Sequence, residues 1–171
     1  MSTRSLLLVA RPLLRVLAVV FVIAAALTAS ALAASFVAGA QVLAASPWPH
    51  PALDPGVAML GTRLAMAVIL AMLGLGHAVV SRLGAMVDSV HAGDPFVAAN
   101  AARLRVIAWA LLAVQLMHMP FQALLNSLRS GTVDIRFDVP VVGLFVVLLL
   151  FVLAGVFEEG ARMRRDLEGT I

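Results

Sequence analysis

The chain has 171 residues, of which 63% are apolar and 12% are charged. Soluble domains contain about 45–50% apolar and about 25% charged residues, so this composition excludes an ordinary soluble globular protein. The net charge of +3 comes with 12 Arg and no Lys. These Arg residues lie scattered at segment ends, which does not fit a direct nucleic-acid-binding surface. The absence of Cys excludes disulfides, thiolate-ligated metals and thiol catalysis.

Four stretches are long and apolar enough to cross a bilayer as helices, which takes about 20 residues each. They comprise residues 16–38, 57–80, 106–125 and 139–157. The sequence therefore predicts an all-α membrane protein, with one four-helix transmembrane domain over residues 1–171. A secretory signal peptide is the alternative for the first stretch, with a cleavage site at Ala31-Leu32-Ala33. Its apolar run exceeds the usual ~7–15 residues of such signals, so we favour an uncleaved span.

The distribution of Arg predicts the direction of the spans, because cytoplasmic segments carry an excess of Arg and Lys. With the N-terminus inside, nine Arg lie on the cytoplasmic side and three on the outer side. The cytoplasmic set is Arg4, Arg11, Arg15, Arg82, Arg103, Arg105, Arg162, Arg164 and Arg165, and the outer set is Arg63, Arg129 and Arg136. We therefore expect a multi-pass protein of the bacterial cytoplasmic membrane with both termini in the cytoplasm.

The predicted outer loops cover residues 46–55 and 126–138. The first contains four prolines, which favour extended backbone, and Trp48 at the expected level of the membrane interface. In the second, residues 132–139 alternate between polar and apolar side chains. This alternation is typical of a half-buried strand, although a linker with the same alternation by chance is an equal alternative.

The connection between the second and third spans predicts a cytoplasmic helical hairpin over residues 82–105. Apolar side chains recur at helical spacing through His91, so the second span should continue to that point as a helix. Ala92-Gly93 then interrupts the helix. Asp94 fits an N-cap and Pro95 a first helical position. The hairpin would extend on the order of 15 Å beyond the membrane, at about 1.5 Å per residue.

Two roles are open for the polar residues of this hairpin. In the structural role, Asp94 and Pro95 start the helix, Phe96 packs against the preceding helix, and Asn100 forms a hydrogen bond within the hairpin. Arg103 and Arg105 would then mark the level of the lipid headgroups. In the functional role, the hairpin is a docking surface for a cytoplasmic protein.

The tail, residues 158–171, should continue the fourth span as a helix. Glu158 and Arg162 are four residues apart, as are Arg164 and Glu168, so both are expected to form ion pairs. Glu158 could also pair with His77, which lies at a similar depth near the end of the second span.

The central and C-terminal segments resemble the bacterial membrane family catalogued as domain of unknown function 2975. The central likeness is carried by Gly93-Asp94-Pro95-Phe96, Asn100, Arg103-Leu104-Arg105, Ile107 and Trp109. The C-terminal likeness is carried by Val156-Phe157-Glu158-Glu159-Gly160-Ala161, Met163, Asp166-Leu167 and Thr170-Ile171. The resemblance implies four spans and no established activity. It also implies an association with small helix-turn-helix regulators. Glu158-Glu159 departs from the family pattern, in which basic or mixed polar residues are common.

Polar side chains inside the spans suggest a functional cluster, because such residues are costly in hydrocarbon. Gln115, His118 and Gln122 share one face of the third span, and Arg63 lies at a matching depth in the second. These four residues could form a polar cavity open to the outside, which binds a ligand or senses protons through His118. The alternative is that they only hold the helices together by hydrogen bonds. Pro120 should kink the third span.

The spans contain several glycines, and the sequence contains no common enzyme motif. Close helix contacts are expected at glycines, which allow backbones to approach. The glycines in or near spans are Gly39, Gly74, Gly76, Gly143 and Gly155. The usual motifs for hydrolases, zinc peptidases and nucleotide binding do not occur, and the four His are too dispersed for a metal site.

The sequence therefore predicts a non-enzymatic membrane protein without cofactors. We expect a sensory or regulatory protein that acts with a cytoplasmic partner, such as a small helix-turn-helix regulator. The alternative is a small transporter or channel subunit with a polar path near Arg63, Gln115 and His118. Four spans are few for a transporter, so this alternative requires a homo-oligomer.

Overall fold

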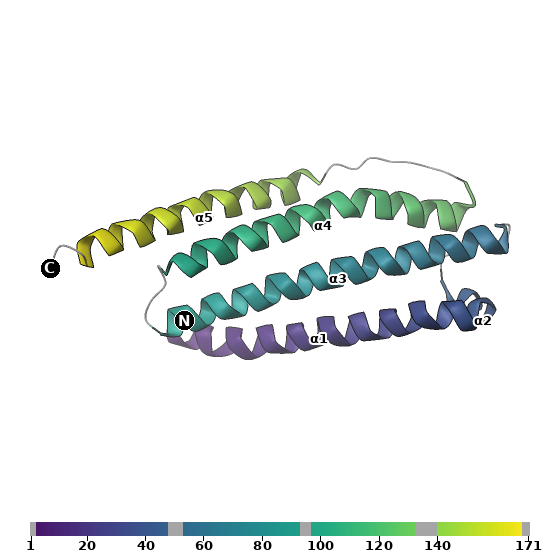
Figure 1. Ribbon diagram of the computed structural model, residues 1–171, viewed down its shortest axis with the longest axis horizontal. Coiled ribbons are helices and arrows are strands. Elements are labelled where there is room, and N and C mark those ends of the chain that lie inside the picture. Colours follow the sequence, from purple (N-terminus) through teal and green to yellow (C-terminus); the bar gives the residue numbers. More distant parts are fainter. Residues whose placement is uncertain (1–2, 48–52, 93–96, 133–139, 169–171) are drawn as a thin grey trace. The chain divides into compact units, whose positions relative to one another are not determined.

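The computed structural model describes residues 3–47, 53–92, 97–132 and 140–168, and within them all regular structure is helical (Figure 1). The helices are α1 (Thr3–Val37), α2 (Gly39–Ala45), α3 (Pro55–His91), α4 (Ala98–Ser130) and α5 (Val141–Glu168). The alternating segment that suggested a strand lies, apart from Thr132, outside the described residues, as does Trp48.

Four of the described helices are long and apolar enough to cross a membrane. These segments are Ala10–Val37, Pro55–His91, Ala98–Ser130 and Val141–Asp166. Large apolar side chains on them stay exposed, such as Leu27 at 68% and Val142 at 78%. Exposing this much apolar surface to water costs free energy, whereas contact with lipid does not. The four helices therefore indicate a multi-pass membrane protein, in agreement with the composition.

The first predicted span, residues 16–38, ends within one residue of α1, which ends at Val37. The helix is interrupted at Ala38 and restarts as the short α2, a helix that the sequence analysis did not predict. Ala38 has φ −124° and ψ 46°, which is outside the helical region. Gly39 begins α2 close to α3, since a Cβ on it would lie 3.0 Å from Met59 Cε.

The start of α3 shows a cap that the sequence interpretation missed. Asp54 Oδ1 accepts hydrogen bonds from the backbone N–H groups of Gly56, at 2.8 Å, and Val57, at 3.2 Å. Pro55 follows as the first helical residue, where its missing N–H costs nothing. We recognised the same Asp-Pro pattern at residues 94–95, which lie outside the described residues, but not at residues 54–55.

The prediction for the end of α3 is confirmed, because α3 runs through His91 and stops at Ala92. The next helix, α4, begins at Ala98, whereas the predicted start at Pro95 lies outside the described residues. The Asn100 N–H bonds to the Val97 carbonyl at 2.8 Å, so the first turn of α4 is tighter than an α-helical turn. The tail prediction is also confirmed, since α5 continues without interruption to Glu168.

The chain divides into two compact units. Unit 1 comprises residues 1–20, 75–113 and 141–171, and unit 2 comprises residues 21–74 and 114–140. Small side chains dominate both interiors. Alanine accounts for seven of the thirteen buried apolar residues in the described part of the chain: Ala58, Ala65, Ala101, Ala108, Ala110, Ala154 and Ala161. Such residues allow helices to pack closely in membranes.

Candidate functional site

A hydrogen-bonded cluster joins the end of α3 to the start of α4 in unit 1. Asn100 is 1% exposed and donates from Nδ2 to Ser89 Oγ at 2.7 Å. Arg103 donates from Nη1 to Asn100 Oδ1 at 2.7 Å and to the Ala85 carbonyl at 3.1 Å. The Ser89 hydroxyl in turn donates to the Met86 carbonyl at 2.7 Å. We call Ala85, Ser89, Asn100 and Arg103 the hairpin cluster.

The hairpin cluster follows from helix geometry and from the cost of burying polar atoms. Asn100 and Arg103 are three residues apart, so they share one face of α4 and meet α3 together. A buried amide must be hydrogen-bonded, and Asn100 meets this requirement across the two helices. The expectation that Asn100 bonds within the segment 82–105 is confirmed. Asp94, Pro95 and Phe96 of the same motif lie outside the described residues.

Two ion pairs extend these contacts to the remaining long helices of unit 1. Arg11 of α1 contacts Asp88 of α3 at 2.6 Å. Arg105 of α4 contacts Glu158 of α5 at 2.5 Å. The side chains of both pairs are between 43% and 61% exposed, so each pair adds little to stability. They connect α1 and α5 to the helices that carry the hairpin cluster.

Two expected pairings, Glu158 with Arg162 and Glu158 with His77, differ in the structure. Glu158 pairs with Arg105, and not with His77 or Arg162. His77 Nε2 instead lies 3.3 Å from Ser81 Oγ, one turn along α3. Arg162 pairs with Glu159, three residues away, at 2.8 Å. Helical spacing allows either Glu158 or Glu159 to pair with Arg162. Glu158 faces α4 and pairs with Arg105, so Arg162 pairs with Glu159.

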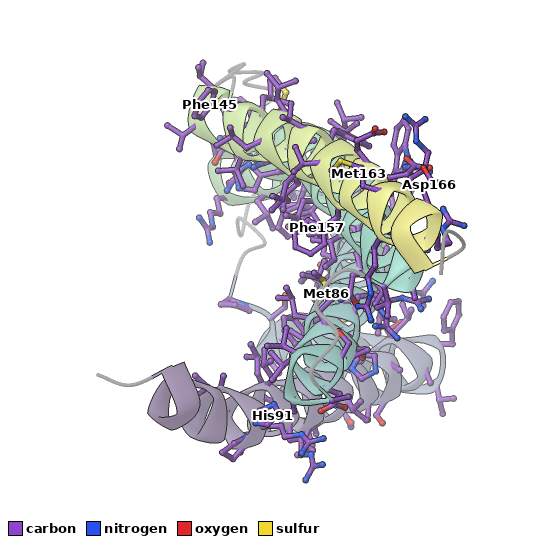
Figure 2. All side chains as sticks on the ribbon, turned by 90° about the vertical axis from the view of Figure 1, so that its left-hand side faces the viewer. Met86, His91, Phe145, Phe157, Met163 and Asp166 are labelled. Atoms are coloured by element: carbon purple, nitrogen blue, oxygen red, sulfur yellow. The ribbon has the colours of Figure 1, made fainter. Side chains whose placement is uncertain are left out.

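Exposed side chains lie on the last turns of α3 and α5. His91 is exposed at the end of α3, and Met163, at 56%, and Asp166 are exposed on α5 (Figure 2). Met86 is half-buried on α3. This part of unit 1 therefore combines a fixed polar interior with a mixed polar and apolar surface.

Arg63 of the predicted intramembrane cluster binds α1. Its Nε donates to Ser35 Oγ at 3.1 Å, and its Nη2 donates to the Ser35 carbonyl at 2.6 Å. The guanidinium carbon lies 4.2 Å from the centre of the Phe36 ring, which is a cation–π contact. Sequence reasoning missed Ser35 and Phe36, although the Ser-Phe pair interrupts a run of small apolar residues.

The other members of that cluster stay within α4. His118 Nε2 and Gln122 Nε2 lie 3.1 Å apart, one helical turn from each other, and both residues are exposed. Gln115 is half-buried, and α4 runs through Pro120 without a break. The structure thus brings His118 and Gln122 together, whereas the meeting of Arg63 with His118 across the bundle stays a prediction. Within the described residues, no three His, Asp or Glu side chains converge as a metal site requires.

A family model described as "Protein of unknown function (DUF2975)" matches residues 40–171, which is more than half of the chain. The chain belongs to the DUF2975 family. The resemblance seen in the sequence is therefore confirmed. No curated protein and no solved structure matches the chain. The DUF2975 match begins within α2 and includes the hairpin cluster and α5, whereas α1 and its residues Arg11 and Ser35 precede it.

Proposed function

We propose that this DUF2975 protein is a non-enzymatic regulatory or sensory protein of the bacterial cytoplasmic membrane. In this proposal, the end of α3, the start of α4 and the last turns of α5 form its cytoplasmic surface, and that surface binds a soluble regulatory protein. The excess of Arg in these segments supports the orientation, because Arg-rich segments remain in the cytoplasm.

The burial of Asn100 carries the proposal. Asn100 lies within α4, and its bonds are those expected from a structural role, but the same fixed arrangement also suits a docking surface. Here the bonds from Asn100 to Ser89 and from Arg103 to Ala85 hold two helices in one arrangement. The exposed residues around them consequently keep fixed positions, and a preorganised surface binds a partner at a lower entropic cost.

The charge of this surface indicates the chemistry of the partner. In the described part of unit 1, nine Arg outnumber five acidic residues. The basic residues are Arg4, Arg11, Arg15, Arg82, Arg103, Arg105, Arg162, Arg164 and Arg165, and the acidic residues are Asp88, Glu158, Glu159, Asp166 and Glu168. We therefore expect the partner to present an acidic face, since complementary charges guide association and orientation.

Site-specific photocrosslinking in intact cells tests the proposal. A photoreactive amino acid at His91 should crosslink a soluble protein, whereas the same amino acid at Ser130, exposed in unit 2, should not. Reversal of charge at Arg162, whose side chain is 66% exposed, should weaken the crosslink without lowering the amount of protein in the membrane. Equal crosslinking at both positions, or none at His91, would overturn the proposal.

A further inference from the structure

A cavity of about 710 Å³ lies beside the break between α1 and α2, within unit 2. The end of α1, the short α2 and the start of α3 form its walls. Apolar groups predominate among the lining residues, including Phe36, Leu43, Ala58 and Met59. Its volume lies within the range of about 300–1,000 Å³ that is typical of small-molecule sites.

Among the described residues that line this cavity, Arg63 is the only charged one. It follows the start of α3 by eight residues, which places it about 12 Å along the helix at 1.5 Å per residue. Ser35, which is 1% exposed, fixes its orientation. The Ser35 hydroxyl donates to the Leu32 carbonyl at 2.6 Å and accepts the Arg63 Nε–H bond.

The charge of Arg63 is not balanced within the described residues. Arg63 contacts Ser35 and Phe36, and no described carboxylate pairs with it. A guanidinium has five N–H donors, and the bonds to Ser35 use two of them. A cation on an apolar span is costly unless an anion or a polar group approaches it, which makes such a residue a candidate binding group.

A further polar residue, Ser46, lines the same cavity. Ser46 lies just after α2, and its Oγ is buried without a hydrogen bond within the described part of the chain. Buried hydroxyls are normally hydrogen-bonded, so this one is an exception, although its Oγ is shielded and not presented to the cavity. The described lining therefore offers one cation, with Ser35 and Ser46 as the other polar residues, on mainly apolar walls.

We propose that this cavity binds an anionic amphiphile, a molecule with a negatively charged head and an acyl chain. The head accepts hydrogen bonds from Arg63, and the chain lies along the apolar side chains, among them Phe36, Leu43 and Met59. A fatty-acid carboxylate and a lipid phosphate both have this chemistry. The proposal does not depend on the proposed partner binding, because the two sites belong to different units.

Photolabelling of the full chain in phosphatidylcholine nanodiscs tests the site. The probe is a palmitate that carries a diazirine, and mass spectrometry locates the label. We expect labelled peptides from residues 35–46 and 53–63, with labelling suppressed by unlabelled palmitate and not by hexadecanol, which lacks the charge. Arg63→Gln should lower labelling about tenfold, because charge-assisted hydrogen bonds are the strong ones. Competition by phosphatidylglycerol would show whether a lipid phosphate also occupies the site.

A matched pair of variants separates binding from folding. Ala40 and Ala45 are both exposed residues of α2, but only Ala40 lines the cavity. Ala40→Phe should fill the cavity and abolish labelling while Arg63 keeps its bonds to Ser35, whereas Ala45→Phe should label like the unmodified protein. Equal competition by hexadecanol, unchanged labelling in Arg63→Gln, or equal loss in the two Phe variants would overturn the proposal.

Discussion

Asp88 and Ser89 are consecutive residues of α3 that bind two different helices. Asp88 Oδ1 forms an ion pair with Arg11 Nη2 of α1 at 2.6 Å. Ser89 Oγ accepts a hydrogen bond from Asn100 Nδ2 of α4 at 2.7 Å. Consecutive side chains on a helix point about 100° apart, because a turn contains 3.6 residues. One turn of α3 therefore contacts both of its neighbours in unit 1.

The first prediction concerns Asn100. Asn100→Ala removes the bond to Ser89 and leaves Arg103 without its Asn100 acceptor. Loss of these bonds should lower the free energy of unfolding by about 1–3 kcal/mol, because polar groups are left unpaired in a buried position. Thermal unfolding in detergent, followed by circular dichroism, would measure this loss.

A double-mutant cycle with Ser89→Ala provides the control for that measurement. If Asn100 acts through Ser89, the double variant should lose less stability than the sum of the two single variants. Strict additivity of the two losses would contradict the role assigned to their hydrogen bond.

The second prediction concerns the ion pair between Arg105 and Glu158. Both side chains are at least half exposed, so either Arg105→Glu or Glu158→Arg should cost less than about 1 kcal/mol. The double reversal should restore the thermal midpoint, because it recreates the pair with the charges exchanged. Raising the salt concentration should shrink all of these differences. A midpoint that stays low in the double reversal would show that one of the two residues has another role.

The four spans could be predicted because their signal is strong and local. Each long helix contains an apolar stretch of about 20 residues, and the bilayer sets that length. The end of α3 at His91 was also predictable, since Ala92-Gly93 interrupts the apolar period there. Such features depend on neighbours in sequence and not on contacts between distant helices.

Contacts between helices were less predictable, because spacing identifies a face of a helix but not its neighbour. Asn100 was expected to bond within the segment 82–105, but its partner Ser89 was not identified. Arg63 was placed opposite α4 by its depth, whereas its hydrogen bonds go to Ser35 of α1. Rotation about the helix axis decides such cases. A rotation of one residue, about 100°, changes which helix a side chain meets.

The third prediction concerns the start of α3. Asp54→Ala removes the side chain that caps the N–H groups of Gly56 and Val57, and should cost about 0.5–2 kcal/mol. Asp54→Ser should retain most of the stability, because a hydroxyl oxygen also accepts such bonds. Thermal unfolding of both variants in detergent would distinguish loss of the cap from loss of the charge. Equal destabilisation by Ala and Ser would argue against capping as the role of Asp54.

The fourth prediction uses a pair of glycines on α3. A Cβ on Gly61 would lie 2.5 Å from Leu128 Cδ2 and 3.2 Å from its Cγ, and Leu128 of α4 is only 3% exposed. Gly74, by contrast, has nothing described within 4 Å of such a Cβ, although its sequence context suggested a close contact.

Gly61→Ala should therefore destabilise the protein by about 1–3 kcal/mol, the usual cost of forcing atoms into a packed interior. Gly74→Ala should be neutral or stabilising by up to about 1 kcal/mol, because Ala favours the helix over Gly. Leu128→Val should partly rescue Gly61→Ala, since it removes the end of the side chain that the new methyl group meets. Thermal unfolding in one detergent compares all three variants. Equal losses for Gly61→Ala and Gly74→Ala would mean that helix propensity, and not contact with Leu128, determines the effect.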